Sequence, residues 1–139
     1  MYNITKMKIL KPAHDVFEAF VDPGKIGNFW FSSSSERWEQ GKTITLRYDE
    51  FNAESQIQIV EIEKDKKIVF NWGNTVTISL QETEPKTTIV EIIEEGFDEN
   101  DPQLIEKLLD NKEGWVFMLT NLKAYLENGI RTLRTGLMK

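Results

Sequence analysis

The side chains of this sequence that could recognise another molecule are mostly aromatic rings. Four tryptophans, three tyrosines and eight phenylalanines occur in 139 residues. Aromatic rings suit a pocket wall because they combine a large apolar surface with, in Trp and Tyr, a polar tip that can orient a ligand. Ordinary core packing is the competing and commoner interpretation for any one ring. The candidate wall residues are Trp38, Trp72, Trp115, Tyr48 and Phe70.

Trp30 and Glu94 are candidates of a different kind. Trp30 is interpreted either as part of a pocket mouth or lid, or as a partly buried anchor. Glu94 shares strand parity with Val90 and Ile92. An inward-facing Glu94 would place a carboxylate in apolar surroundings, where it could hold a ligand or act as a general acid, and where a charge is costly unless it is paired. The simpler expectation is that Glu94 lies in solvent at the end of its strand.

No pattern in the sequence specifies catalysis or metal binding. His14 is the single histidine and is expected on the first turn of a short surface helix. Ser32–Ser35, expected in a polar loop, lack the glycines and the strand-turn-helix setting of a nucleophile elbow. The carboxylates do not follow the spacing of a calcium loop, and no glycine-rich phosphate loop occurs. The sequence therefore predicts no catalytic residue, no metal site and no cofactor.

Composition limits the classes of partner. The formal net charge is −6 and no basic cluster occurs, which argues against binding to nucleic acid. No stretch approaches the roughly 18 apolar residues that a membrane-spanning helix needs. Cysteine is absent, which fits a reducing compartment. We expect a single domain over residues 1–139, in the cytoplasm and without membrane contact.

Hydrophobic periodicity predicts the strands that hold these residues. Alternation of apolar and polar residues is typical of strands with one buried face, and it predicts about six of them. They cover residues 2–9, 43–48, 55–63, 68–72, 76–80 and 88–94. A change of parity in the third of these strands predicts a β-bulge near Ile59. Short turns between consecutive strands favour an antiparallel meander.

Helical spacing predicts two short helices and one long one. The short helices are expected between the first and second strands, at residues 12–20 and 25–31. The long helix is expected over residues 101–128, with Asp101 as its N-cap and Gly129 as its C-terminal stop. The remaining residues, 130–139, could extend this helix or pair with a partner, but fraying is the default for a terminus.

Several short motifs occur in an order and spacing found in one known family. They are Val16–Pro23 followed by Phe29-Trp30, then Lys67–Trp72, Thr88–Phe97, Gly114-Trp115 and Leu119–Leu122. This series resembles the START-like helix-grip superfamily, and within it the bacterial proteins similar to the C-terminal domain of the activator of heat-shock protein 90 ATPase. Two positions depart from the family pattern. Gln40 precedes Gly41 where the family often has a second glycine, and Glu94-Glu95 stands where a histidine often precedes Gly-Phe.

The resemblance implies an α+β helix-grip fold, in which a curved antiparallel sheet wraps around the long C-terminal helix and leaves a cavity. We therefore predict non-enzymatic binding of a small apolar ligand between sheet and helix. Two alternatives stay open, because fold does not select function: a co-chaperone-like domain that stimulates a chaperone ATPase in a stress response, and a cyclase or hydrolase that uses the Glu94 carboxylate. The protein is expected to be a monomer or a homodimer. The predicted pocket residues are Trp30, Trp38, Leu46, Tyr48, Phe70, Trp72, Ile78, Val90, Ile92, Glu94, Trp115, Leu119 and Leu122.

Overall fold

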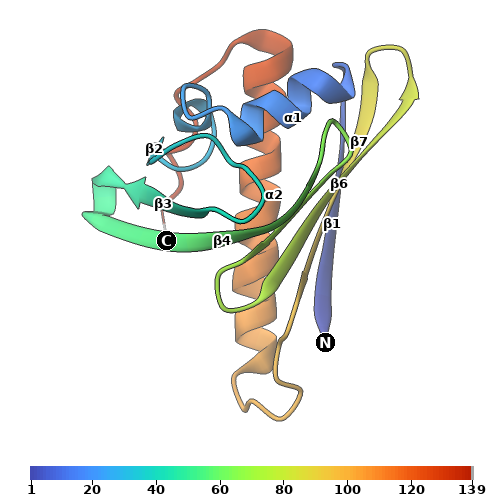
Figure 1. Cartoon of the computed structure of the whole chain (residues 1–139). Coiled ribbons are helices and arrows are strands. Elements are labelled where there is room, and N and C mark those ends of the chain that lie inside the picture. Colours follow the sequence, from blue (N-terminus) through green and yellow to red (C-terminus); the bar gives the residue numbers. More distant parts are fainter. Residues whose placement is uncertain (139) are drawn as a thin grey trace.

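A curved antiparallel sheet and one long helix make up most of the fold. The computed structural model describes residues 1–138. Its elements, in chain order, are β1 (Tyr2–Ile9), α1 (Ala13–Val21), the 3-10 helix η1 (Ile26–Asn28), β2 (Ser33–Ser34), β3 (Thr43–Tyr48), the 3-10 helix η2 (Asp49–Phe51), β4 (Ala53–Glu63), β5 (Lys67–Asn71), β6 (Thr75–Glu84), β7 (Thr87–Glu95) and α2 (Leu104–Asn128). Figure 1 shows α2 running through the concave side of the sheet, with α1 crossing it near one end.

The strands form a meander, as the short turns predicted. Their order in the sheet is β1-β7-β6-β5-β4-β3-β2, and all neighbours are antiparallel. The first strand is thus paired with the last long one, at one edge. The sheet has seven strands and not about six, because Ser33–Ser34 pair with Leu46 and Arg47 where a loop was expected. Two polar residues are too short a segment to show an alternating pattern.

The bulge predicted in β4 is confirmed. The pairing of β4 with β5 shifts register between Ile59 and Glu61. Ile57 and Ile59 before the shift are buried, and Ile62 after it packs against the same core. A bulge also bends the strand and increases its twist, and this helps the sheet to curve around α2.

The long helix begins three residues later than predicted. It starts at Leu104, and Asp101 belongs to a turn that precedes it, in which the Leu104 N–H donates to the Asp101 carbonyl over 3.0 Å. The Asp101 carboxylate accepts a hydrogen bond from the N–H of Gln103 and pairs with Lys107. Asp-Pro is equally suited to open a turn or a helix, and here it opens the turn. The predicted stop is confirmed: Gly129 caps α2 in the left-handed conformation, with φ of 69°.

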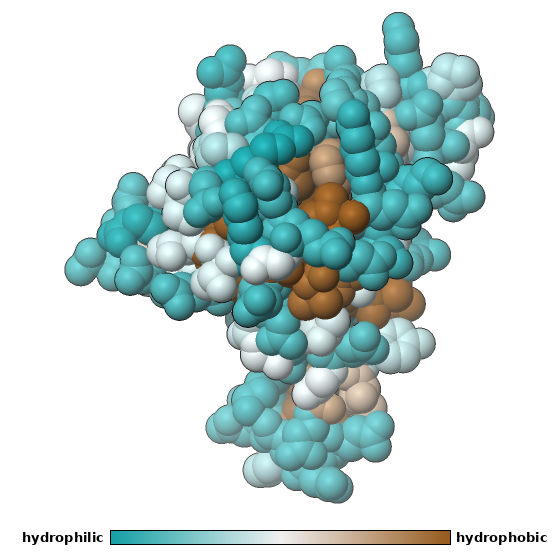
Figure 2. Space-filling view, viewed as in Figure 1, coloured by the Kyte–Doolittle hydropathy of each residue, from teal (hydrophilic) through white to brown (hydrophobic). Residues whose placement is uncertain are grey.

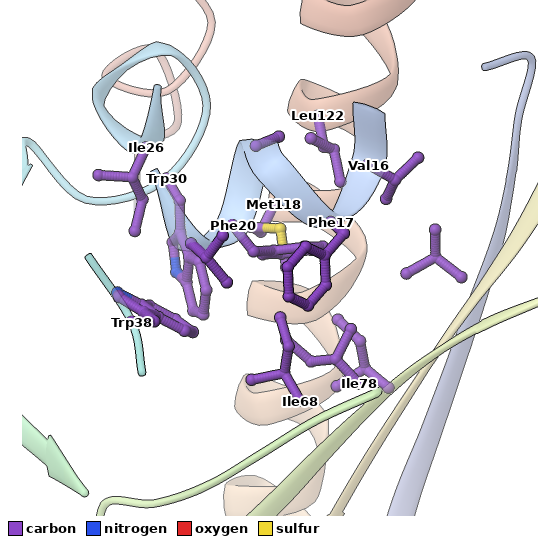
Figure 3. Packing of buried hydrophobic residues seen from close by; sticks show 14 of the residues in the cluster. Val16, Phe17, Phe20, Ile26, Trp30, Trp38, Ile68, Ile78, Met118 and Leu122 are labelled. Carbon is purple, nitrogen blue, oxygen red and sulfur yellow. The ribbon is translucent and has the colours of Figure 1, made fainter. Parts of the chain in front are cut away.

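One core lies between α1, α2 and the concave face of the sheet. Figure 3 shows Phe17 of α1 directed toward Ile68 and Ile78 of the sheet, with Met118 of α2 nearby. The ring of Phe20 packs edge-on against Trp30, with centroids 6.1 Å apart. Each fully buried side chain of this size stabilises the fold by roughly 1.5–3 kcal/mol. The segment predicted as a second short helix at 25–31 contains only η1, but its apolar residues still dock on this core.

The surface is mostly hydrophilic. Apolar side chains nevertheless reach the surface near the centre of the view in Figure 2, within a hydrophilic surround. Within residues 1–138, no helix is both long and apolar enough to cross a membrane.

Candidate functional site

A pocket of about 250 Å³ opens between α2 and the segments that precede β2 and follow β5. Most of its lining is aromatic, and the polar lining residues are few. The lining residues are Phe29, Trp30, Tyr48, Trp72, Asp110, Asn111, Gly114, Trp115, Phe117, Met118 and Arg134. The side chains from α2 are presented together because positions 111, 114, 115 and 118 lie on one face of a helix.

The structure divides the predicted pocket residues into two groups. Four line the pocket: Trp30, Tyr48, Trp72 and Trp115. The other nine are buried in the core behind it: Trp38, Leu46, Phe70, Ile78, Val90, Ile92, Glu94, Leu119 and Leu122. Contact of any of these residues with a ligand stays a prediction.

The rings of three tryptophans meet at the pocket. Trp72 and Trp115 are stacked, with centroids 5.6 Å apart and planes at 29°. The ring of Trp30 meets Trp115 edge-on at 5.5 Å and Trp72 edge-on at 6.4 Å, and Trp38 lies 6.1 Å from it on the core side. Figure 3 shows Trp30 and Trp38 lying next to each other. Such pairs add about 0.5–1.5 kcal/mol beyond area burial, so this wall is held rigidly.

The expectation that Glu94 lies in solvent is wrong. Its side chain faces inward from β7 and the residue is only 4% exposed. Oε1 accepts hydrogen bonds from Asn111 Nδ2 at 2.8 Å and Trp115 Nε1 at 3.1 Å. Oε2 accepts from Asn74 Nδ2 at 3.0 Å and Trp72 Nε1 at 3.4 Å. Burial is tolerated because four donors replace water around the carboxylate.

Arg134 of the C-terminal tail closes one side of the pocket mouth. Its Nε donates to the Trp30 carbonyl at 2.8 Å, and its Nη2 donates to Ser32 Oγ at 3.2 Å and Glu50 Oε1 at 2.7 Å. The Arg134 side chain is 11% exposed. The expectation that the tail frays is therefore wrong at this position, and Figure 1 shows the tail turning back from the end of α2 toward β3.

The pKa values of two ionisable groups at the mouth are shifted in opposite directions. Burial raises the pKa of the Tyr48 phenol, against the smaller effects of a hydrogen bond with Trp30 and of the nearby Arg134 charge. Partial burial also opposes ionisation of Glu50. Hydrogen bonds from its own backbone N–H, Ser32 and Arg134 outweigh that effect, so the pKa of Glu50 is lowered. At neutral pH the mouth therefore contains a neutral phenol and an Arg–Glu ion pair.

Sequence reasoning missed several pocket residues. Asn111, Gly114 and Met118 follow helical spacing around Trp115, and that spacing was a usable signal. Arg134 carries no such signal, because its partners are about 84 to 104 positions away in the chain.

The structure confirms that His14 lies in the first turn of a short helix, α1. His14 is at the surface, where its Nδ1 lies 3.0 Å from Asp65 Oδ1. Among the described residues, no group of three or more His, Asp or Glu side chains could hold a metal ion.

A curved antiparallel sheet that grips a long C-terminal helix is the arrangement of the START-like helix-grip class. The match to one family is more specific. Residues 11–127 match the family described as Activator of Hsp90 ATPase homolog 1-like protein. The chain belongs to this family.

Solved structures share this fold. Protein SSP2350 from Staphylococcus saprophyticus is 54% identical, with 94% of this chain and 95% of that chain covered and a TM-score of 0.87. The Aha1 dimer from Colwellia psychrerythraea is 16% identical, with 93% and 98% covered and a TM-score of 0.78. DynU16, from the dynemicin biosynthetic locus, is 17% identical, and 96% of this chain matches 49% of that chain with a TM-score of 0.82. No curated protein matches the sequence.

Proposed function

We propose that this protein binds a small apolar molecule in the pocket between α2 and the sheet, without chemically changing it. The observation that supports this proposal is the pocket of about 250 Å³ walled by Trp30, Trp72 and Trp115. Cavities of roughly 150 Å³ in other proteins hold benzene, so this one has room for a somewhat larger molecule. Burying a ligand against such walls contributes roughly 25 cal/mol per Å² of apolar area removed from water.

The position of Glu94 argues against its use as a catalytic acid. It does not line the pocket, and its carboxylate is bound by Trp72, Asn111 and Trp115, which do line it. Its two oxygens already accept four hydrogen bonds. A cyclase or hydrolase mechanism that depends on this carboxylate therefore has little support.

Gly114 offers a direct test of the pocket. It lies in α2 at the pocket, and a Cβ added there would meet no atom within 4 Å. Gly114→Phe should fill the pocket without disturbing the backbone. Gly114→Ala is the matched control, because it leaves most of the space and should stabilise the helix by about 0.5–1 kcal/mol.

The experiment is a titration of tryptophan fluorescence with fatty acids, sterols and small aromatic compounds. We expect at least one of these to change the emission of the parent and of Gly114→Ala in a saturable way, and Gly114→Phe to lose the response. A flat response to all compounds, or an equal response in Gly114→Phe, would overturn the proposal.

A co-chaperone-like role is the second candidate, and it has its own supporting observation. Ile105, Leu109 and Val116 on α2 are 73%, 66% and 42% exposed, and this spacing places them along one side of the helix. The matching family is described by activation of Hsp90 ATPase, and the Colwellia psychrerythraea neighbour is described as a dimer. Both a chaperone and a second copy of the chain are therefore proposed partners, in a cytoplasm whose reducing conditions suit a protein without cysteine.

A pull-down with a bacterial chaperone of the Hsp90 class, followed by an ATPase assay, tests this role. The parent protein should stimulate the ATPase activity of the chaperone, and a Leu109→Glu variant should stimulate it less. No change in turnover at saturating protein would remove this candidate.

A further inference from the structure

Glu94 is unusual because its buried carboxylate is surrounded by neutral donors. The four hydrogen bonds come from two indole N–H groups and two amide NH2 groups. An ionised carboxylate is an acceptor only, with about four lone-pair positions, so four donors occupy it fully. The four neutral donors replace the hydrogen bonds to water that the carboxylate loses on burial.

The carboxylate connects the two walls of the pocket. Trp72 and Asn74 follow β5 on the sheet side, whereas Asn111 and Trp115 belong to α2. Each oxygen serves one side: Oε2 binds the sheet pair and Oε1 binds the helix pair. Asn111 is itself oriented, because its Oδ1 accepts a hydrogen bond from Asn3 Nδ2 at 3.1 Å.

The hydrogen bonds also determine how the two tryptophans face the pocket. An indole has a single N–H donor, which points in one direction. Because both indoles donate to the same carboxylate, their polar edges converge on Glu94, which is not part of the pocket lining. The N–H groups of the two stacked rings, 5.6 Å apart, are therefore occupied by Glu94, and the rest of each ring is apolar.

We propose that Glu94 is a positioning residue that sets the specificity of the pocket. It draws the N–H groups of Trp72 and Trp115 out of the pocket wall and fixes the wall as an apolar surface without tryptophan donors. The pocket then favours ligands that need no hydrogen-bond donor from this wall. This specificity rests on the proposed ligand binding, but the positioning itself can be tested without a ligand.

The variant that tests the positioning is Glu94→Gln, which keeps the size and replaces one acceptor oxygen by a donor NH2. This NH2 must face either Asn111 and Trp115 or Asn74 and Trp72, which are donors too. Glu95→Gln is the matched control, because Glu95 is the next residue and is exposed.

The first readout is the set of indole N–H signals in a two-dimensional ¹H–¹⁵N spectrum. In Glu94→Gln we expect the signals of Trp72 and Trp115 to move and their hydrogen exchange to become about tenfold faster. The signal of Trp38 should stay, because its Nε1 donates to Ser34 Oγ at 3.2 Å and not to Glu94. Glu95→Gln should leave all of these signals in place.

Unchanged Trp72 and Trp115 signals in a folded Glu94→Gln protein would overturn the positioning role. Equal movement of the Trp38 signal would also overturn it, since that result indicates a general loss of packing. If Glu94→Gln does not fold, the Asn74→Ala variant tests the positioning role instead. It removes one hydrogen-bond donor to Glu94 Oε2, and Asn74 does not line the pocket. The Trp72 signal should then move more than that of Trp115, and no movement of either would contradict the proposal.

The second readout is binding of the neutral fluorescent probe 1-aminonaphthalene, which needs no hydrogen-bond donor from the wall. We expect equal affinity in the parent and Glu95→Gln, and about tenfold weaker binding in Glu94→Gln. If the parent and Gly114→Phe bind the probe equally, the proposed function fails while the indole signals still decide the positioning. If the probe binds the pocket and Glu94→Gln does not weaken it, the claim on specificity fails.

Discussion

At the scale of single residues, the site depends on which groups satisfy one buried carboxylate. Strand parity placed Glu94 on the same face as Val90 and Ile92, and both of these are buried. Parity alone could not decide between solvent and burial, because the deciding donors are 17 to 22 positions away from Glu94 in the chain. Local sequence carries no information about partners brought together only by the tertiary fold.

The same hydrogen bonds should be visible in stability. Glu94→Gln leaves buried donors without an acceptor, so we expect the free energy of unfolding to fall by about 1–3 kcal/mol. Exposed Glu95→Gln should change it by less than about 0.5 kcal/mol. Urea unfolding followed by circular dichroism measures both. Similar values for the two variants would be inconsistent with a saturated carboxylate at position 94.

At the scale of elements, periodic segments were predictable and irregular ones were not. The spacing of Trp115, Leu119 and Leu122 identified the buried side of α2, and all three residues are buried. The start of α2 was misplaced because Asp101 satisfies a turn as well as it would a helix. The tail was misjudged because a single side chain, Arg134, holds it.

Arg134→Ala should release the tail from the pocket mouth. The variant loses the three hydrogen bonds to Trp30, Ser32 and Glu50, and it leaves the core untouched. Quenching of tryptophan fluorescence by acrylamide should become more efficient, because the pocket tryptophans become more accessible. Exposed Arg131→Ala is the control and should behave like the parent. Equal quenching in all three proteins would mean that the tail does not cover the mouth.

Acid should open the same contact. The pKa of Glu50 is lowered from its ordinary value of 4.5. A carboxyl group whose pKa is lowered in the folded state stabilises the fold at any pH above its ordinary pKa. This contribution is lost as the pH falls through the folded pKa. We expect acrylamide quenching to rise below pH 4.5 in the parent. In Glu50→Gln it should already be high at neutral pH, and a parallel pH profile in both proteins would show that another group controls the tail.

At the scale of the whole molecule, the order of elements was enough to predict a helix gripped by a curved sheet. Alternation gave the inward face of each long strand, and short turns gave the antiparallel order. The position of the pocket was not predictable in the same way, because parity says which side chains face α2 but not where helix and sheet fail to fill the space. Leu119 and Ile92 thus pack in the core, whereas Trp72 and Trp115 reach the pocket.

Two leucines on α2 test how the helix sits in the sheet. Leu119 is completely buried and Leu109 is 66% exposed. Leu119→Ala should lower the free energy of unfolding by about 2–5 kcal/mol, because it leaves a cavity in the core. Leu109→Ala should change it by less than about 0.5 kcal/mol. Denaturant unfolding measures the free energy of unfolding of both variants. Equal losses would mean that α2 does not pack against the sheet through the side that contains Leu119.

The central claim is that a small apolar molecule occupies the space between α2 and the sheet. The most direct measurement is a ¹H–¹⁵N titration of the parent protein with 1-aminonaphthalene, which maps the contact on the chain. We predict saturable shifts concentrated at Trp30, Trp72, Gly114 and Trp115. Shifts confined to the exposed side of α2 around Leu109, or no saturable shift at all, would contradict the account.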